Sequence, residues 1–284
     1  MGAVSLRAFA KINLHLRVHG VRADGFHDVQ TILQSIDLFD RVTCAARRGP
    51  FEILCRQPGV PTDRSNLVWK AAQLLWRASG QSGEVRDASI VLEKQIPMQA
   101  GLGGGSSDAA AALLALRRAW RLRVTDEVLR ELAAETGSDV PFFLVGGTAL
   151  ALGRGDEVYP LQDLPPLHLV LVLPPFGVST RDAYAWLDAE GAGPRERPPF
   201  AYLPARLAND LEGPVVRRHP VIKSLSNRLS ADGALLAAMS GSGSAVFGVF
   251  DSERKARSAA RRLARSGAEV RQARFKPRRK GTWS

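Results

Sequence analysis

A glycine- and serine-rich stretch at residues 97–112 carries the clearest chemical signal in the sequence. It reads P-M-Q-A-G-L-G-G-G-S-S-D-A-A-A-A, follows a strand-like run at 89–94, and continues into an alanine- and leucine-rich segment typical of a helix. Backbone N–H groups in a glycine loop are not covered by side chains, and the first N–H groups of a helix are unpaired at the positive end of its dipole. The order strand, glycine loop, helix therefore predicts a site for an anion such as a phosphate.

This stretch differs from the two best-known phosphate loops. A Walker A loop needs Gly-x-x-x-x-Gly-Lys-Ser/Thr, but Ser106 stands five positions after Gly101 and no lysine follows it. A dinucleotide fingerprint needs a glycine three positions after Gly103, where Ser106 again stands. A flexible turn is the alternative, but the flanking strand and helix argue against a mere linker.

Two polar patterns could add side chains to such a site. Apolar and polar residues alternate at 8–18, which predicts a strand with Lys11 and Asn13 on one face. Most lysines on strands face solvent, so the pattern alone gives Lys11 no catalytic role. Asp139 lies in G-S-D-V-P-F-F at 137–143, which is typical of an ordinary helix start. Helix capping and a carboxylate near the anion remain alternative roles for Asp139.

Periodicity predicts the elements that position these residues. Strands are expected in short pieces at 30–37, 40–45 and 50–56, as a pair at 146–155, and at 167–173. Helices are expected at 67–78, 108–120 and 125–135, after Ser179, and from 207. A second Gly/Ser turn at 239–247 leads into a strand, and two such loops suggest one site built from both halves of the chain.

The composition is that of an ordinary soluble protein. The chain has 284 residues, of which 45% are hydrophobic and 24% charged. No run approaches the ~20 apolar residues that span a bilayer, and the first residues lack the plan of a signal peptide, so we expect a cytoplasmic protein without a membrane partner. Cys44 and Cys55 are not spaced as a metal or redox motif, so we expect both to be structural.

The positive charge is concentrated near the C-terminus. The net charge is +11, and twelve Lys/Arg with three Asp/Glu fall at 251–284, which leaves +2 for the rest. Apolar residues recur there at helical spacing, namely Ala256, Ala259, Ala260, Leu263 and Ala264, and Gly267 is a stop signal. The arginines therefore indicate the solvated face of an amphipathic helix rather than a nucleic-acid site, since no aromatic residues are interleaved. Residues 275–284 are expected to be loose.

The combination of blocks resembles the GHMP kinases. K-I-N-L at 11–14, P-M-Q-A-G-L-G-G-G-S-S at 97–107 and M-S-G-S-G-S at 239–244 carry this resemblance. A-D-G-F-H, G-S-D-V-P-F-F, G-V-S-T and N-D-L-E resemble the branch of the superfamily that acts on cytidine diphosphate methylerythritol; they stand at 23–27, 137–143, 177–180 and 209–212. The blocks are ordered along nearly the whole chain.

The resemblance implies a two-lobed α/β (α+β) fold with the active site in the cleft between the lobes. Residues 1–153 would form the N-terminal ATP-binding lobe, and 154–284 the C-terminal substrate lobe with its basic helix and tail. The implied activity is ATP-dependent phosphorylation of the substrate's 2-hydroxyl in the non-mevalonate isoprenoid precursor pathway. Mg²⁺ would accompany ATP, and neither nucleic acid nor membrane is an expected partner.

Site residues follow from the resemblance. Asp139 would be the general base and Lys11 would stabilise charge. The ATP loop would comprise Pro97, Met98, Gln99, Ala100, Gly101, Leu102, Gly103, Gly104, Gly105, Ser106 and Ser107. The substrate side would comprise Asn13, Phe26, His27, Thr180 and Tyr184. Metal ligands stay unassigned, although Ser106 or Ser107 could touch Mg²⁺.

Phe26 departs from the family pattern, in which tyrosine is frequent. A ring that stacks on cytosine survives this change, but any hydroxyl contact is lost. One alternative is a GHMP kinase for homoserine or phosphomevalonate, against which the A-D-G-F-H turn speaks, because a substrate without a base needs no stacking ring. Another is a non-catalytic RNA-binding protein that uses the basic C-terminus.

Overall fold

Two sheets organise the chain, and the computed structural model describes residues 2–191, 207–265 and 268–278. The first sheet has six strands in the order β3-β4-β2-β5-β6, with β1 also paired to β2. The second sheet has the order β10-β7-β9-β8. The strands of the first sheet are β1 (Val4–Val21), β2 (His27–Pro50), β3 (Glu52–Cys55), β4 (Arg86–Glu93), β5 (Thr148–Leu152) and β6 (Glu157–Pro160). Those of the second are β7 (His168–Leu173), β8 (Leu236–Met239), β9 (Val246–Phe250) and β10 (Glu269–Arg274).

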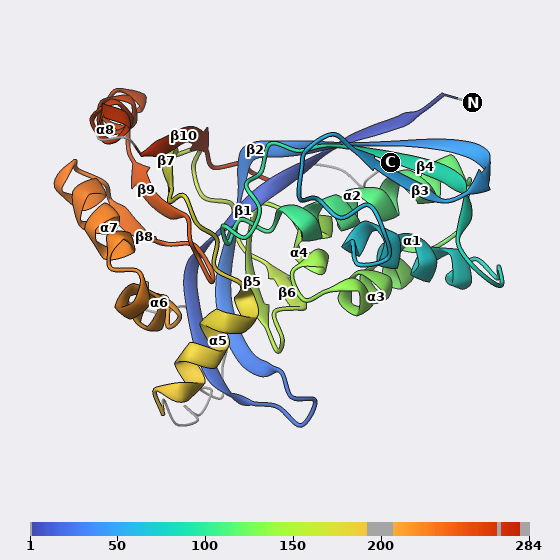
Figure 1. The fold of residues 1–284 in the computed structure, drawn as a ribbon, viewed down its shortest axis with the longest axis horizontal. Helices are drawn as coiled ribbons and strands as arrows, with labels where there is room; N and C mark the ends of the chain where they lie inside the picture. Colours follow the sequence, from blue (N-terminus) through green and yellow to red (C-terminus); the bar gives the residue numbers. More distant parts are fainter. Residues whose placement is uncertain (1, 192–206, 266–267, 279–284) are drawn as a thin grey trace.

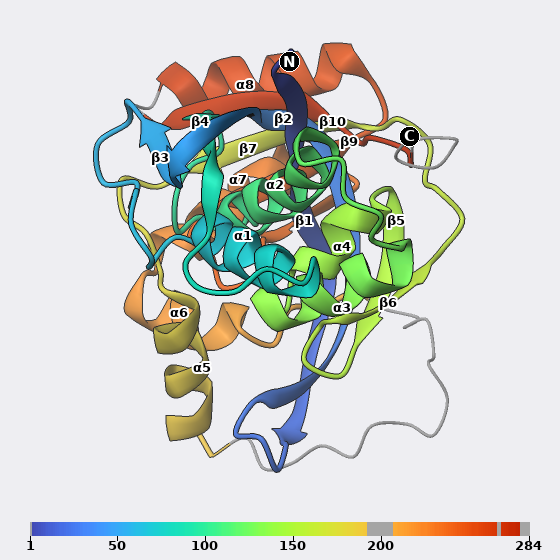
Figure 2. The same cartoon turned by 90° about the vertical axis from the view of Figure 1, so that its right-hand side faces the viewer.

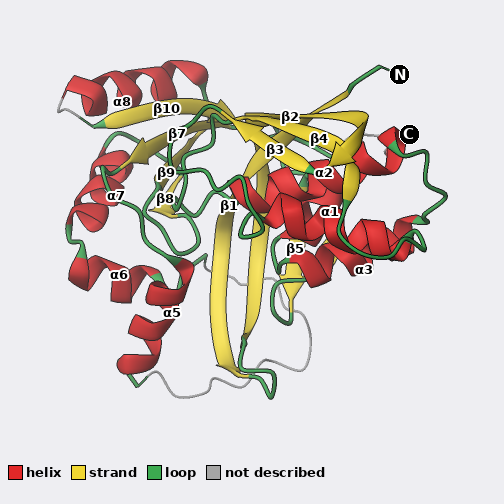
Figure 3. Ribbon diagram, turned by 45° about the vertical axis from the view of Figure 1, so that its right-hand side comes forward, coloured by secondary structure: helices red, strands yellow, loops and turns green. Residues whose placement is uncertain are grey.

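The antiparallel hairpin of β1 and β2 is the longest pairing and reaches from one half of the molecule to the other (Figure 3). The sequence predicted short pieces at 30–37 and 40–45, which is wrong, because β2 runs unbroken through both. The buried carboxylate of Asp40 lies within this strand, and it accepts hydrogen bonds from the backbone N–H groups of Gln95 and Ile96. Partners distant in sequence thus satisfy a polar residue that locally resembles a strand break.

Four helices cover one face of the first sheet (Figures 1 and 2). They are α1 (Leu67–Ala78), α2 (Gly104–Ala119), α3 (Asp126–Thr136) and α4 (Val140–Val145). All residues at 107–116 of α2 are buried, because α1, α4 and the sheet surround this helix. Its many alanines allow the close approach. The three longer helices begin and end within a few residues of their predicted bounds.

The second sheet lies between helices and the β1–β2 hairpin. Its helices are α5 (Thr180–Ala189), α6 (Glu212–Arg218), α7 (Val221–Ala231) and α8 (Glu253–Arg265). The predicted amphipathic helix is confirmed in α8, which buries Ala256, Ala259, Ala260 and Leu263 and leaves its arginines outside. Ala264, also expected on the apolar stripe, is exposed. The predicted stop at Gly267 lies outside the described residues. The other face of the sheet packs its apolar side chains against the hairpin.

The helix predicted from 207 begins only at Glu212. The preceding residues pair with β1 instead, since the N–H of Leu16 donates to the carbonyl of Ala208 and the N–H of Asp210 donates to that of Leu16. This pairing joins the second half of the chain to the hairpin. The described helices include none that is long and apolar enough to cross a membrane.

Residues 275–278 return to the first sheet, so the expectation of a loose segment is wrong for them. Phe275 is 3% exposed, and the N–H of Lys276 donates to the Ser35 carbonyl at 2.8 Å. The N–H of Arg278 donates to Asp163 Oδ2 at 2.7 Å. The free energy gained by burying the Phe275 ring exceeds the conformational entropy lost when these residues are ordered. The basic composition alone had suggested a loose segment. Residues 279–284 lie outside the described part, and the lobe boundary at residue 153 stays a prediction.

The buried ring of Phe275 provides a test of how residues 275–278 pack on the first sheet. We expect Phe275→Ala to lower the free energy of unfolding by about 3–5 kcal/mol, because it removes a core ring. Leu54→Ala, at a side chain that is 49% exposed on β3, is the control and should cost less than about 1 kcal/mol. Urea unfolding followed by circular dichroism measures both. Equal losses would contradict the anchoring role of Phe275.

Candidate active site

A cleft of ≈ 540 Å³ collects most of the residues expected to act on substrates. It lies where β1, the glycine loop, the start of α4 and the start of α5 meet. The expected residues on its lining are Lys11, Asn13, residues 97–106, Asp139, Thr180 and Tyr184. Phe26, His27 and Ser107 are not part of this lining. One cleft therefore unites segments from both halves of the chain.

Lys11 is buried at the floor of this cleft. It follows a shift in the β1–β2 register after Phe9, and only 4% of the residue is exposed. Its Nζ donates to Asn13 Oδ1 at 2.6 Å and lies 3.4 Å from Asp139 Oδ2. Asn13 in turn donates to the Thr31 hydroxyl at 2.8 Å. The predicted shared face is confirmed, and this chain of bonds orients the ammonium toward Asp139.

Asp139 occupies the position before α4, yet within the described structure its side chain makes no capping hydrogen bond to that helix. Its carboxylate instead approaches Lys11, and its side chain is 38% exposed. Of the two roles that the sequence left open, the geometry favours the charged group over the cap. An ammonium beside a carboxylate that substrate can reach is an arrangement suited to proton transfer.

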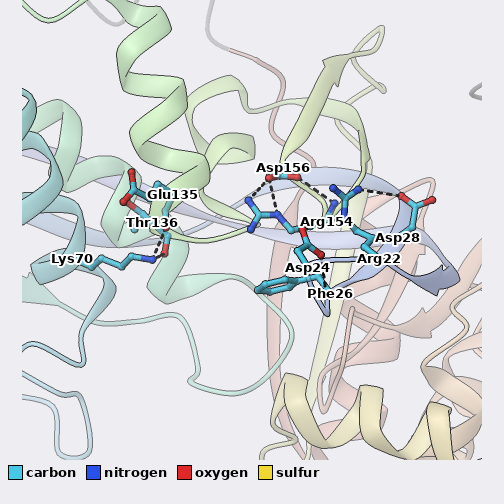
Figure 4. A network of polar contacts seen from close by, with 9 residues as sticks. All are labelled: Arg22, Asp24, Phe26, Asp28, Lys70, Glu135, Thr136, Arg154 and Asp156. Carbon is cyan, nitrogen blue, oxygen red and sulfur yellow. Dashed lines mark hydrogen bonds and ion pairs between the residues drawn. The ribbon is translucent and has the colours of Figure 1, made fainter.

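A lysine on α1 is bonded to the C-terminal end of α3 (Figure 4). Lys70 Nζ donates to the carbonyl of Glu135 at 2.5 Å and to that of Thr136 at 3.2 Å. These carbonyls end α3, where a positive charge also complements the helix dipole. Asp139 follows three residues later, so the link restrains its backbone.

The glycine loop presents free backbone donors to the cleft. Gly103 precedes α2 with φ +70°, and no side chain among the described residues caps the helix there. A side chain at Gly105 would meet nothing within 4 Å, so this position is open. The first N–H groups of a long, uncapped helix therefore face space that a phosphate could fill.

The two Gly/Ser loops touch each other, as the sequence suggested. The Ser240 hydroxyl donates to the Gly101 carbonyl at 2.9 Å, and the N–H of Ala245 donates to the carbonyl of Ala100 at 3.2 Å. At Gly101, whose φ is +72°, an added Cβ would lie 2.0 Å from the Ser240 carbonyl oxygen. Only glycine permits this contact.

A buried ion cluster behind the glycine loop was missed from the sequence. Lys94 Nζ contacts the carboxylates of Asp40 and Asp108, and all three side chains are almost fully buried. Asp40 also accepts two backbone N–H groups, whereas Asp108 Oδ1 has no hydrogen-bond partner among the described residues. Burial raises the pKa of the Asp108 carboxyl to about 7. In the sequence, the feature that could have indicated this cluster was the presence of two aspartates within otherwise apolar runs.

Aromatic side chains lie at the α5 end of the cleft. The rings of His27 and Tyr184 stack with centroids 4.7 Å apart, and His27 Nε2 lies 2.8 Å from Asp188 Oδ1. Burial, with the nearby charge of Asp139, raises the pKa of Tyr184. The Thr180 hydroxyl lies 3.3 Å from that of Ser242. Tyr184 thus stacks with His27 and lines the same cleft as Asp139.

The two serines of the loop differ in orientation. Ser106 lines the cleft, whereas the hydroxyl of Ser107 donates to the Phe9 carbonyl at 2.7 Å on the other side of α2. The described residues include no group of three or more His, Cys, Asp or Glu that could hold a metal ion. Of the two loop hydroxyls, only that of Ser106 belongs to a residue on the cleft lining.

Comparisons with known proteins agree with this geometry. The model "GHMP kinases N terminal domain" matches residues 66–147, and "GHMP kinases C terminal" matches 201–269. The 4-diphosphocytidyl-2-C-methyl-D-erythritol kinase of Anaeromyxobacter dehalogenans (strain 2CP-C) is 48% identical over 263 residues, which cover 88% of this chain and 82% of that relative. This chain belongs to that family.

Further members of the 4-diphosphocytidyl-2-C-methyl-D-erythritol kinase family are similar along nearly their full length. That of Pelotomaculum thermopropionicum (strain DSM 13744 / JCM 10971 / SI) is 43% identical, covering 94% of this chain and 96% of its own. A crystal structure of 4-(cytidine 5'-diphospho)-2C-methyl-D-erythritol kinase has 37% identity and a TM-score of 0.75, covering 96% and 99%. Methanococcus jannaschii mevalonate kinase, at 11% identity and a TM-score of 0.67, covers 97% and 99% and shows the fold alone. The predicted GHMP kinase fold is confirmed.

The contact between the glycine loops makes a quantitative prediction. Gly101→Ala should lower the free energy of unfolding by about 2–5 kcal/mol, because it adds left-handed strain and an overlap with a backbone carbonyl. Gly105→Ala is the matched control on the same loop. It should be neutral or stabilising by up to about 1 kcal/mol, since alanine favours a helix and nothing lies in its way. Chemical unfolding without nucleotide measures both, and similar values would contradict the close approach.

Proposed function

We propose that this chain is an ATP-dependent kinase that phosphorylates the 2-hydroxyl of 4-(cytidine 5'-diphospho)-2-C-methyl-D-erythritol. The observation that carries the proposal is the ion pair of Lys11 and Asp139, which lines the same cleft as the uncapped start of α2. Family membership supports the choice of substrate. The enzyme would act in the cytoplasm, in isoprenoid precursor synthesis, on a small molecule and without a nucleic-acid partner.

Asp139 and Lys11 have different roles in the proposed reaction. Asp139 accepts the proton of the attacking hydroxyl, and Lys11, which pairs with Asp139, offsets charge that develops between the nucleophile and the transferred phosphoryl group. The hydrogen bond from Lys11 to Asn13 keeps the ammonium in place before substrate arrives. A general base contributes ~10²–10⁴-fold, whereas positioning can contribute roughly 7–11 kcal/mol, so positioning is the larger effect.

The glycine loop binds the phosphates of ATP. Backbone N–H groups at Gly103, Gly104 and Gly105 lead into α2, and its dipole favours the negative charge. Mg²⁺ would neutralise phosphate charge when bound and would be held mostly by phosphates and waters. The Ser106 hydroxyl, on the cleft lining, is the protein group that could contribute to holding it. Residues 1–153 would act as the ATP lobe and 154–284 as the substrate lobe.

The cytosine of the substrate stacks on Phe26 and Tyr184, and His27 reads its edge. A carboxylate only accepts hydrogen bonds, so Asp188 holds the hydrogen on Nε2 of His27. The other ring nitrogen, Nδ1, is then the group left for the base. Thr180 and Asn13, both on the cleft lining, bind the polyol part.

Release of ADP tests the proposed substrate. We expect turnover with ATP, Mg²⁺ and the cytidine substrate, and none with homoserine or phosphomevalonate, because these lack a base for the aromatic pocket. A coupled spectrophotometric assay measures all three. Turnover with only one of the other alcohols would retain the ATP loop and reject the cytosine site. ATP binding without any turnover would reject the kinase.

Substitution of the catalytic pair tests its roles. Asp139→Asn should lower kcat by ~10²–10⁴-fold, because it removes the base, while the KM for ATP changes less than about threefold. Lys11→Ala should give a comparably large loss. Glu131→Gln, an isosteric charge removal at an exposed position of α3, should leave kcat unchanged. Near-normal turnover of Asp139→Asn would assign Asp139 a structural role.

A further inference from the structure

Three cationic side chains line the cleft, and the proposed mechanism uses only one of them. They are Lys11, Lys94 and Arg154. Lys11 faces Asp139, and Lys94 is enclosed by two buried carboxylates. Arg154 remains to be explained. It lies on the tight turn between β5 and β6, and its side chain is 28% exposed.

The guanidinium of Arg154 is held on one edge by Asp156 (Figure 4). Nε and Nη2 donate to Asp156 Oδ2 at 3.1 and 2.7 Å, and the backbone N–H of Arg154 donates to Oδ1 at 3.2 Å. The turn itself is tied to β2, because the N–H of Val29 donates to the carbonyl of Gly153 at 2.7 Å. Nη1 makes no hydrogen bond to any residue that the structure describes. A donor is therefore fixed in direction and left unused.

Phe26 lies against the flat face of the same guanidinium. Arg154 Cζ is 5.1 Å from the centre of the Phe26 ring, within the range of a cation–π contact. Asp24 fixes the turn before the ring by accepting the Phe26 N–H at 3.1 Å, and Arg22 pairs with Asp24 and Asp28 (Figure 4). Phe26 is nevertheless 51% exposed. Its ring has a cation on one side and remains accessible to a planar ligand.

We propose that Arg154 binds the diphosphate of the cytidine substrate, with Phe26 and Arg154 acting as one recognition unit. A nucleoside diphosphate joins a planar base to an anion through one ribose, which matches an exposed ring beside a guanidinium. Arginine suits phosphate because its donors form a rigid fork, and Asp156 removes the entropy cost of orienting it. This inference rests on the proposed function. The same chemistry could serve the phosphates of ATP, which the experiment separates.

Calorimetric binding of cytidine, CMP, CDP and ATP to the full chain tests the assignment. Arg154→Met should weaken CDP binding by about 10- to 100-fold, the usual loss for a charged hydrogen bond, and cytidine binding by less than about fivefold. ATP binding should not change. Phe26→Leu should weaken cytidine and CDP by the same factor. With the complete substrate, Arg154→Met should raise KM and leave kcat within about threefold.

Arg22→Met is the matched control, because Arg22 belongs to the same network but not to the cleft lining. It should change CDP binding by less than about threefold, and circular dichroism should show all variants folded. Arg154→Lys keeps the charge without the fork and should fall between wild type and Arg154→Met.

Each other outcome overturns the inference in a distinct way. Equal weakening of CDP and cytidine by Arg154→Met would make Arg154 only a support for the ring. Weakening of ATP instead of CDP would assign the guanidinium to the other substrate. An unchanged affinity for CDP would reject Arg154 alone, whereas a wild-type chain that binds ATP but not CDP would reject the cytidine site of the proposed function as well.

Discussion

Backbone contact between two glycine-rich loops is the constraint on which the site depends. The Gly101 carbonyl receives the Ser240 hydroxyl, and the neighbouring Leu102 carbonyl receives the N–H of Lys11. These bonds bring the start of α2, the strand that carries Lys11 and the loop before β9 to one place. Side chains at the contact would separate the three elements. The chemistry of the cleft therefore rests on an approach of main chains that only glycine allows.

Two buried lysines near that contact differ in the number and the exposure of their carboxylate partners. Lys94 is enclosed by two buried carboxylates, so its charge is fully compensated inside the protein. Lys11 faces a single carboxylate that is partly exposed. Removing an ammonium from water is costly unless partners replace the lost hydration. The first arrangement sets one ammonium against two buried carboxylates, whereas Lys11 and Asp139 form a one-to-one pair whose carboxylate lines the cleft.

Patterns among neighbouring residues in the sequence predicted the elements that depend on neighbouring residues alone. Alternation identified the strand of Lys11 and Asn13, and composition identified the glycine loop and α8. The continuity of β2 was missed, because Asp40 is satisfied by groups 54 to 56 residues away. The docking of Phe275 was missed because a lone ring in a basic stretch has no periodicity. Motifs placed most site residues in one cleft, but Arg154 belongs to no motif, and only tertiary contacts reveal it.

The return of residues 275–278 to the first sheet also bears on the order of synthesis. These residues are translated after the whole second sheet, yet they supply contacts to β2 and to the segment around Asp163. When the first half of a nascent chain leaves the ribosome, residues 275–278 have not yet been synthesised. The first half of the chain therefore acquires its full set of contacts only after the second sheet has been synthesised.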